Sequence, residues 1–118
     1  MIEPITKSFR VRRGDDWEGE TFRLISPDGA SFWANTVVRS QIRTTHESTT
    51  VAHEFTLTPV VTTEGANGVL TLTLTMSGTQ SALLTPGNYV GDIEVKSDGF
   101  RKSSFCNFQF AVFADVTR

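Results

Sequence analysis

Hydrophobic and polar residues alternate along several stretches of the chain. In the clearest of them, residues 69–76, threonines alternate with Leu70, Leu72, Leu74 and Met76. Because successive side chains of a strand point to opposite faces, this period of two predicts a half-buried β-strand. Residues 51–58 alternate in the same way, and the turn-forming residues 63–68 separate the two stretches. This arrangement predicts a hairpin.

The same alternation predicts further strands elsewhere, in the segments around residues 5–12, 22–24, 36–43, 89–95 and 108–112. Only residues 79–84 have a helical pattern, and the Pro-Gly pair that follows limits them to one turn crossing between sheets. About seven strands are typical of an all-β, antiparallel β-sandwich of the immunoglobulin-like kind. We expect residues 1–118 to form one such domain.

Composition agrees with a single folded domain. The chain has 118 residues, with 38% hydrophobic and 20% charged residues, and this length suits one hydrophobic core. The formal net charge of -2 gives no overall cationic field, so nucleic acid is not an expected partner. No apolar run reaches the length of a membrane helix, and the first residues do not resemble a signal peptide. We therefore expect no membrane contact, and folding in a cytoplasm.

Motifs for catalysis and for cofactors are missing from the sequence. There is no Gly-x-Ser-x-Gly nucleophile motif and no phosphate-binding glycine pattern. Of the two histidines, His46 lies in a polar loop, whereas His53 falls on the apolar face of a strand and is expected in the core. Neither has the second histidine that a zinc site would need. We predict no enzymatic activity and no cofactor.

An acidic segment follows the first predicted strand, with Asp15, Asp16, Glu18 and Glu20 close together. Such carboxylates supply the oxygen ligands that Ca²⁺ takes from flexible loops. A solvated turn is the simpler interpretation, and the residues leave open whether Asp15, Asp16 and Glu18 bind an ion.

Arginines are concentrated in the first third of the chain, at Arg10, Arg12, Arg13, Arg23, Arg39 and Arg43. Several of them should project from outer strand faces and could together form a cationic strip. Solvated arginines paired within the sheet are the preferred interpretation, and contact with a partner comes next. On that second interpretation Arg39 and Arg43 are interface candidates.

Four aromatic residues are further interface candidates. Phe32 and Trp33 come just after a turn, and Phe105 and Phe113 have the opposite parity to Phe108 and Phe110. Large apolar groups on both faces of the last strand are expected at a subunit interface, because exposed aromatic patches otherwise favour aggregation. A strand that changes sheets or contains a bulge explains the pattern equally well. The single cysteine, Cys106, excludes an intramolecular disulfide and is expected to be a buried, inert thiol.

The order of short motifs along the chain resembles a known family. The segments that carry the resemblance are residues 9–17, 27–29, 37–43, 84–89, 92–95, 98–99 and 115–118. They are similar to those of tailed-bacteriophage structural proteins, in particular the β-sandwich modules related to the N-terminal domain of phage baseplate upper proteins. Residues 32–35, Phe-Trp-Ala-Asn, depart from the Asp-Leu-Thr-Gly segment that is usual in that family. The resemblance implies a virion structural protein that docks to other proteins.

The leading hypothesis is therefore an adaptor that joins a tail fibre or receptor-binding protein to the tail or baseplate. Assembly in the bacterial host cytoplasm, location in the virion, and a homo-oligomer, trimeric or hexameric, would accompany this role. Residues 1–4 and 115–118 could then act as arms that reach a neighbour. The main alternative is a capsid decoration, or cement, protein. A small metal- or sugar-binding module that uses the acidic segment with Trp17, Trp33 and Tyr89 is a third.

Overall fold

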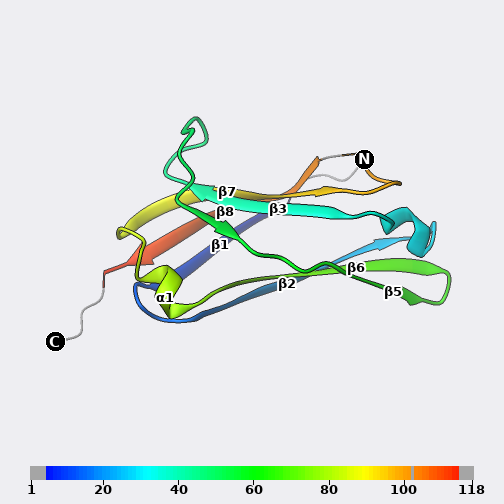
Figure 1. Ribbon diagram of the computed structural model, residues 1–118, viewed down its shortest axis with the longest axis horizontal. Coiled ribbons are helices and arrows are strands. Elements are labelled where there is room, and N and C mark those ends of the chain that lie inside the picture. Colours follow the sequence, from blue (N-terminus) through cyan, green and yellow to red (C-terminus); the bar gives the residue numbers. More distant parts are fainter. Residues whose placement is uncertain (1–4, 102, 115–118) are drawn as a thin grey trace.

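The chain folds into two β-sheets that pack against each other. The structure, a computed structural model, describes residues 5–101 and 103–114. One sheet contains β1 (Ile5–Arg12), β3 (Val37–Arg43), β4 (His53–Phe55), β7 (Gly87–Lys96) and β8 (Ser103–Phe113). The other contains β2 (Trp17–Ser26), β5 (Val60–Glu64) and β6 (Asn67–Met76). Two short helices, η1 (Ala30–Trp33) and α1 (Gly78–Ser81), lie at opposite ends of the molecule (Figure 1).

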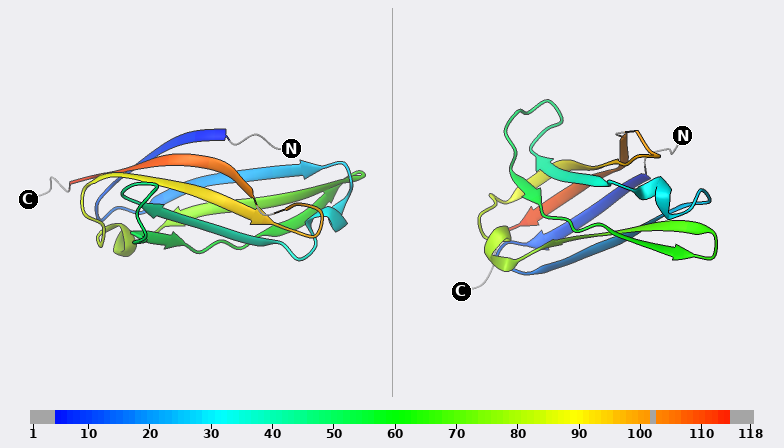
Figure 2. Two further views of the ribbon diagram at one scale, coloured as in Figure 1. Left: turned by 90° about the horizontal axis from the view of Figure 1, so that it is seen from above. Right: turned by 45° about the vertical axis from the view of Figure 1, so that its right-hand side comes forward.

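The strand order defines the sandwich. The five-stranded sheet has the order β1-β8-β7-β3-β4, and the three-stranded sheet has the order β2-β6-β5. The all-β sandwich predicted from the alternation is confirmed, with eight strands in the described residues where about seven were expected. Figure 2 shows the two layers from above and from a rotated view. The predicted arms, residues 1–4 and 115–118, lie outside the described residues.

One strand pair differs from the antiparallel arrangement that was predicted. β1 runs parallel to β8, in a register from Ile5 opposite Cys106 to Arg12 opposite Phe113. Alternation along a strand determines which side chains are buried, and it carries no information about the direction of the neighbouring strand. In the sheet, β1 is an edge strand, and its neighbour is β8, the last strand of the described residues.

The predicted hairpin has a different first strand. β6 pairs with β5, whereas the strand predicted over residues 51–58 is reduced to the short β4, which pairs with β3 in the other sheet. All five residues of β5 are exposed, so its sequence lacks the alternation that marks a half-buried strand. The hairpin closes through Gly65 and Ala66. Gly65 has a φ of +63°, and glycine at the first central position is typical of a type II′ turn.

The core lies between the two sheets. β6 contributes four residues of the predicted apolar face, each no more than 1% exposed: Leu70, Leu72, Leu74 and Met76. The five-stranded sheet contributes residues that include Ile42, Tyr89, Ile93, Val95, Phe108, Phe110 and Val112. These residues match the faces predicted from the alternation.

The helix α1 crosses between the sheets as a single turn, as predicted. Ser77 and Gln80 form a capping box at its start. Its buried Ser81 holds the β1–β2 turn, because the Ser81 hydroxyl donates to the Asp15 carbonyl at 2.8 Å and accepts from the Gly14 N–H at 3.0 Å. In the described part of the chain, no helix is long and apolar enough to cross a membrane.

Candidate functional site

Two of the aromatic interface candidates belong to the core. Trp33 is 1% exposed, and its indole N–H donates to the carbonyl of Gly68 at 3.1 Å. Phe105 is 5% exposed and packs edge-on against Phe22, with ring centroids 5.5 Å apart. Neither ring offers surface to a partner, so their proposed contact with a neighbouring subunit is not supported by their positions.

A β-bulge explains why Phe105 is buried despite its parity. Between Ile93 and Glu94 the register of β7 with β8 shifts, so that Cys106 faces Ile93 and Ser104 faces Glu94. Phe105 is the extra residue of β8, and both Phe105 and Cys106 can then turn inward. The bulge, one of the two explanations left open by the sequence, accounts for the reversed parity at this position.

Phe32 is half-buried at the η1 end of the sandwich. Its ring packs edge-on against Trp33 at 4.7 Å and lies 6.2 Å from the ring of Phe100. The hydroxyl of Ser97 donates to its carbonyl at 2.6 Å. Phe32 therefore holds the loop after β7 in place, and only part of its ring faces solvent.

Phe113 is the aromatic candidate that remains exposed. It ends β8, and 48% of its surface is accessible. The guanidinium of Arg10 lies 5.5 Å from the centre of its ring, within cation–π range. Because β1 runs parallel to β8, Arg12 lies directly opposite Phe113 in the register.

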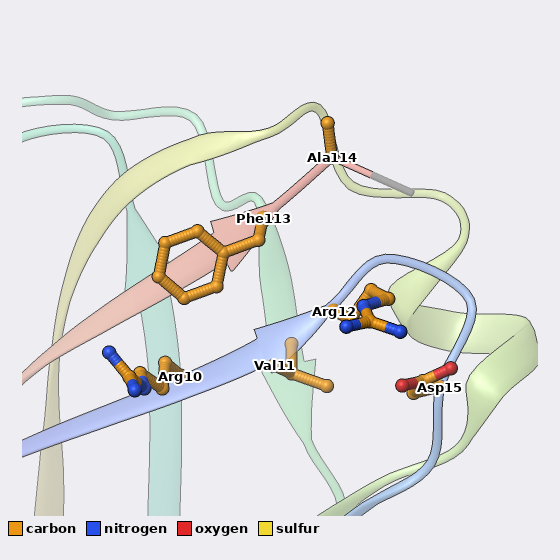
Figure 3. Close-up of a pocket in the computed structure, with 6 residues that line it drawn as sticks. All are labelled: Arg10, Val11, Arg12, Asp15, Phe113 and Ala114. Atoms are coloured by element: carbon orange, nitrogen blue, oxygen red, sulfur yellow. The ribbon is translucent and has the colours of Figure 1, made fainter. Parts of the chain in front are cut away.

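These residues surround an open hollow at the end of β1 and β8, with a volume of about 520 Å³. Figure 3 shows its lining residues, which are Arg10, Val11, Arg12, Asp15, Phe113 and Ala114. We call it the Phe113 hollow. One aromatic ring, two guanidinium groups and one carboxylate give it both an apolar surface and groups that can pair with charges.

A second hollow of about 500 Å³ adjoins the first between β1 and β2, and Asp15, Asp16 and Glu18 of the acidic segment line it. Asp16 is engaged there, because its carboxylate accepts the N–H of Gly78 at 2.5 Å at the start of α1. In residues 5–101 and 103–114, no three metal-ligating side chains converge. Asp15, Asp16 and Glu18 thus have no geometry that favours an ion site.

Arg39 and Arg43 lie on the outer face of the five-stranded sheet. Arg39 pairs with Glu54 at 3.6 Å, and Arg43 donates to the side-chain oxygen of Gln41 at 2.8 Å. The Nε of Arg43 is buried without a hydrogen-bond partner in the described structure. Two small hollows of about 120 and 190 Å³ lie beside β3, and Arg43 and Asp92 line both of them. This polar surface carries both signs of charge.

The arginines of the first third do not form one strip. Arg10 and Arg12 lie on β1, whereas Arg39 and Arg43 lie on β3, and β8 and β7 separate these strands. Arg23 lies on the other sheet, where it pairs with Glu64. Proximity in sequence suggested one surface, but the strand order distributes the arginines over different surfaces.

Two further titratable side chains, Cys106 and His53, are removed from solvent to different extents. Burial raises the pKa of the Cys106 thiol to about 11, so the thiolate is scarce near neutral pH. Partial burial lowers the pKa of His53, and the carboxylate of Glu54 opposes this shift. The His53 ring packs edge-on against Phe55 at 4.8 Å and is half-buried, where a core position was predicted.

Besides Phe113, several apolar residues at the sheet edges and ends are exposed, and none of them was predicted to be a functional residue. They include Ile25, Val37, Val60, Val61 and Leu83. The alternation along β2 could have identified Ile25, because its side chain points to the face opposite that of the buried Phe22 and Leu24. No comparable signal marks Val60 and Val61, which lie next to each other on an edge strand.

Comparisons with known proteins give only distant similarities. The sequence matches no family model and no curated protein. Among solved structures, the chain is similar to a family 123 glycoside hydrolase from Clostridium perfringens at 12% identity and a TM-score of 0.47, covering 98% of this chain and 24% of that one. An internalin-like protein of Listeria monocytogenes is similar at 13% identity and a TM-score of 0.33, with coverages of 95% and 28%. The chain thus spans about a quarter of each.

Proposed function

We propose that this chain is a non-enzymatic structural protein of a phage virion, an adaptor that docks at the tail, baseplate or tail fibre. The resemblance of its motifs to phage baseplate modules motivates the virion role. The observation that carries the docking role is the Phe113 hollow, in which an exposed ring with Arg10 beside it shares the lining with a second arginine, Arg12.

The chemistry of the hollow suits protein docking. Aromatic residues and arginine are enriched at protein interfaces and often contribute most of the binding free energy. A solvent-exposed phenylalanine that is 48% accessible contributes little to folding, and burying it against a partner is favourable. Docking of this kind depends on buried apolar surface and on paired charges, so it requires no catalytic group.

The charges of the hollow indicate what its partner presents. Arg10 and Arg12 each carry a guanidinium that can bind a carboxylate through two parallel hydrogen bonds, and Asp15 supplies one opposing charge. A matching surface has an apolar side chain for Phe113 and an acidic residue beside it. We propose other phage structural proteins as these partners, within a homo-oligomeric assembly.

Capture of purified tail and capsid proteins tests the role. The immobilised chain should retain a tail, baseplate or fibre protein, and Phe113→Ser should weaken the capture at least tenfold, as expected for an interface aromatic worth about 2 kcal/mol. Val37→Ser is the matched control, because Val37 is also an exposed apolar strand residue. Circular dichroism should give folded spectra for both variants. Equal capture by the Phe113 variant would overturn the docking site.

Labelling of purified particles with an antibody to this chain tests the location. Signal at the tail tip supports the adaptor. Signal over the head would overturn it in favour of the capsid cement protein, and absence of signal from the particle would overturn the virion role itself.

A further inference from the structure

In the part of the chain that the structure describes, the two sheets of the sandwich leave four strand edges, at β1, β4, β2 and β5. A strand edge carries unpaired N–H and C=O groups, and proteins usually protect such edges with charges, bulges or very short strands. β4 has three residues, and β1 carries Lys7, Arg10 and Arg12. β2 is bulged near Gly19, and Glu20 at its edge pairs with Lys7 of β1 at 3.1 Å.

The fourth edge, β5, has fewer of these protections, because its single charged residue, Glu64, is already paired with Arg23 of its own chain. Its sequence, Val-Val-Thr-Thr-Glu, contains no lysine and no proline, and its register with β6 is continuous. All five residues are exposed, and Val60 and Val61 keep 50% and 41% of their surface accessible. Valine and threonine have high strand propensity. β5 is therefore suited to pair with another strand.

The hairpin determines which backbone groups of β5 are free. In a hairpin with a two-residue turn, the closing pair, here Glu64 and Asn67, is hydrogen-bonded across the ladder. Backbone groups alternate in direction along a strand, so Thr62 and Val60 also point toward β6. Val61 and Thr63 point away from β6, and each presents an N–H and a C=O at the free edge.

We propose that β5 pairs antiparallel with β5 of a second copy of this chain, about a two-fold axis through Thr62. Val61 then lies opposite Thr63 of the second copy, and each residue donates and accepts one hydrogen bond. The same pair recurs on the other side of the axis. The two three-stranded sheets become one continuous sheet across the dimer.

A second copy fits this edge because the strand is complementary to itself. About the two-fold axis, Glu64 lies opposite Val60 of the second copy, and Thr62 lies opposite its own equivalent. The Glu64 carboxylates are held far apart, so no like charges oppose each other. Glu64 is also neutralised within its own chain by Arg23.

The size of the contact predicts a weak dimer. Two five-residue edges bury far less than the roughly 1,000 Å² expected of a stable interface, so association should depend on concentration. A two-fold contact is compatible with a hexamer that combines two-fold and three-fold axes, and a trimer alone would not contain it. This inference is independent of the virion role and of the Phe113 hollow.

Analytical ultracentrifugation over a concentration series, with charge variants at the axis, tests the dimer. Thr62→Lys and Thr62→Glu each place like charges opposite each other across the axis and should weaken self-association about fivefold. An equimolar mixture of the two variants should recover dimers, because Lys then faces Glu. Recovery by mixing also shows that the single variants remain folded.

Thr73→Lys and Thr73→Glu are the matched controls, because Thr73 is an exposed threonine of the same sheet but lies on its central strand β6. They should self-associate like the unmodified chain. A chain that stays monomeric up to millimolar concentration would overturn the proposal, and so would a mixture that associates no better than its components. Phe113→Ser should leave self-association unchanged, which separates this test from that of the docking role.

Discussion

Trp33 donates its indole N–H to the carbonyl of Gly68 at 3.1 Å, and this buried hydrogen bond ties η1 to the start of strand β6. There is no room for a larger residue at the acceptor, because a Cβ on Gly68 would lie 2.2 Å from the carbonyl oxygen of Gly29. The ring and the close backbone approach together fix how the chain passes from one sheet to the other.

Substitution of Trp33 should therefore reduce stability. Trp33→Phe keeps most of the ring but leaves the Gly68 carbonyl without its donor, which should cost about 1–3 kcal/mol of unfolding free energy. Trp33→Ala adds a cavity and should cost about 3–5 kcal/mol. Urea unfolding measures both. Phe113→Ala is the control and should change the free energy by less than about 0.5 kcal/mol. Equal effects at the two positions would contradict the assignment of Trp33 to the core.

Gly19 should tolerate no side chain. It has a φ of +83° in the bulge of β2, and a Cβ built on it would lie 1.4 Å from the carbonyl oxygen of Leu74. Gly14→Ala is the matched control, with a φ of +92° and no atom within 4 Å of the added carbon. The control should cost about 1–3 kcal/mol through backbone strain alone. Gly19→Ala should cost more, because β6 must also move. Thermal unfolding of the two variants measures the difference.

Stability should depend on pH through His53. Burial lowers its pKa in the folded chain below the ordinary value of 6.5, so the unfolded chain binds the proton first as the pH falls. The free energy of unfolding should decrease as the pH falls below 6.5 and level off below the folded pKa. Urea unfolding from pH 7.5 to pH 5 measures this slope.

His53→Gln should flatten that part of the pH profile. His46→Gln is the control, since His46 is exposed, and it should leave the slope in place. A slope that persists in the His53 variant would assign the effect to other groups.

Cys106 should resist thiol reagents while the chain is folded. Burial, opposed by Lys7 and reinforced by Glu20 and Asp92, raises its pKa to about 11, so at pH 8 the side chain is protonated as well as inaccessible. Absorbance with an aromatic disulfide reagent should report almost no reaction until urea unfolds the chain. Thr21→Cys supplies an exposed thiol as the control and should contribute one rapidly reacting group. Rapid reaction of the unmodified chain would show that β8 opens readily.

The alternation of side chains was enough to predict much of the fold. Leu70, Leu72 and Leu74 were assigned to one face, and all three are fully buried. The alternation also placed Phe113 on the face opposite that of Phe108 and Phe110, and its side chain is exposed there. These predictions succeed because the direction of a side chain in a strand depends on local geometry.

The burial of Phe105 could not be predicted from the alternation alone. One extra residue in β8 reverses its direction, and the cause is the register with β7, a strand several residues away in sequence. The hairpin was mispredicted for a similar reason. All five residues of β5 are exposed, so no alternation of buried and exposed positions marks the strand, and its pairing with β6 is visible only in three dimensions.

Local patterns along the chain are sufficient to predict the all-β class, the strand faces that form the core, the single helical turn before β7 and the burial of Cys106, because each depends on residues near one another in the chain. Three features depend on the folded chain: β1 lies parallel to β8, Arg10 and Arg12 lie beside Phe113 while β8 and β7 separate them from Arg39 and Arg43, and β5 is an edge strand among the described residues. These features depend on which distant strands become neighbours, and the packing of the whole core selects those neighbours.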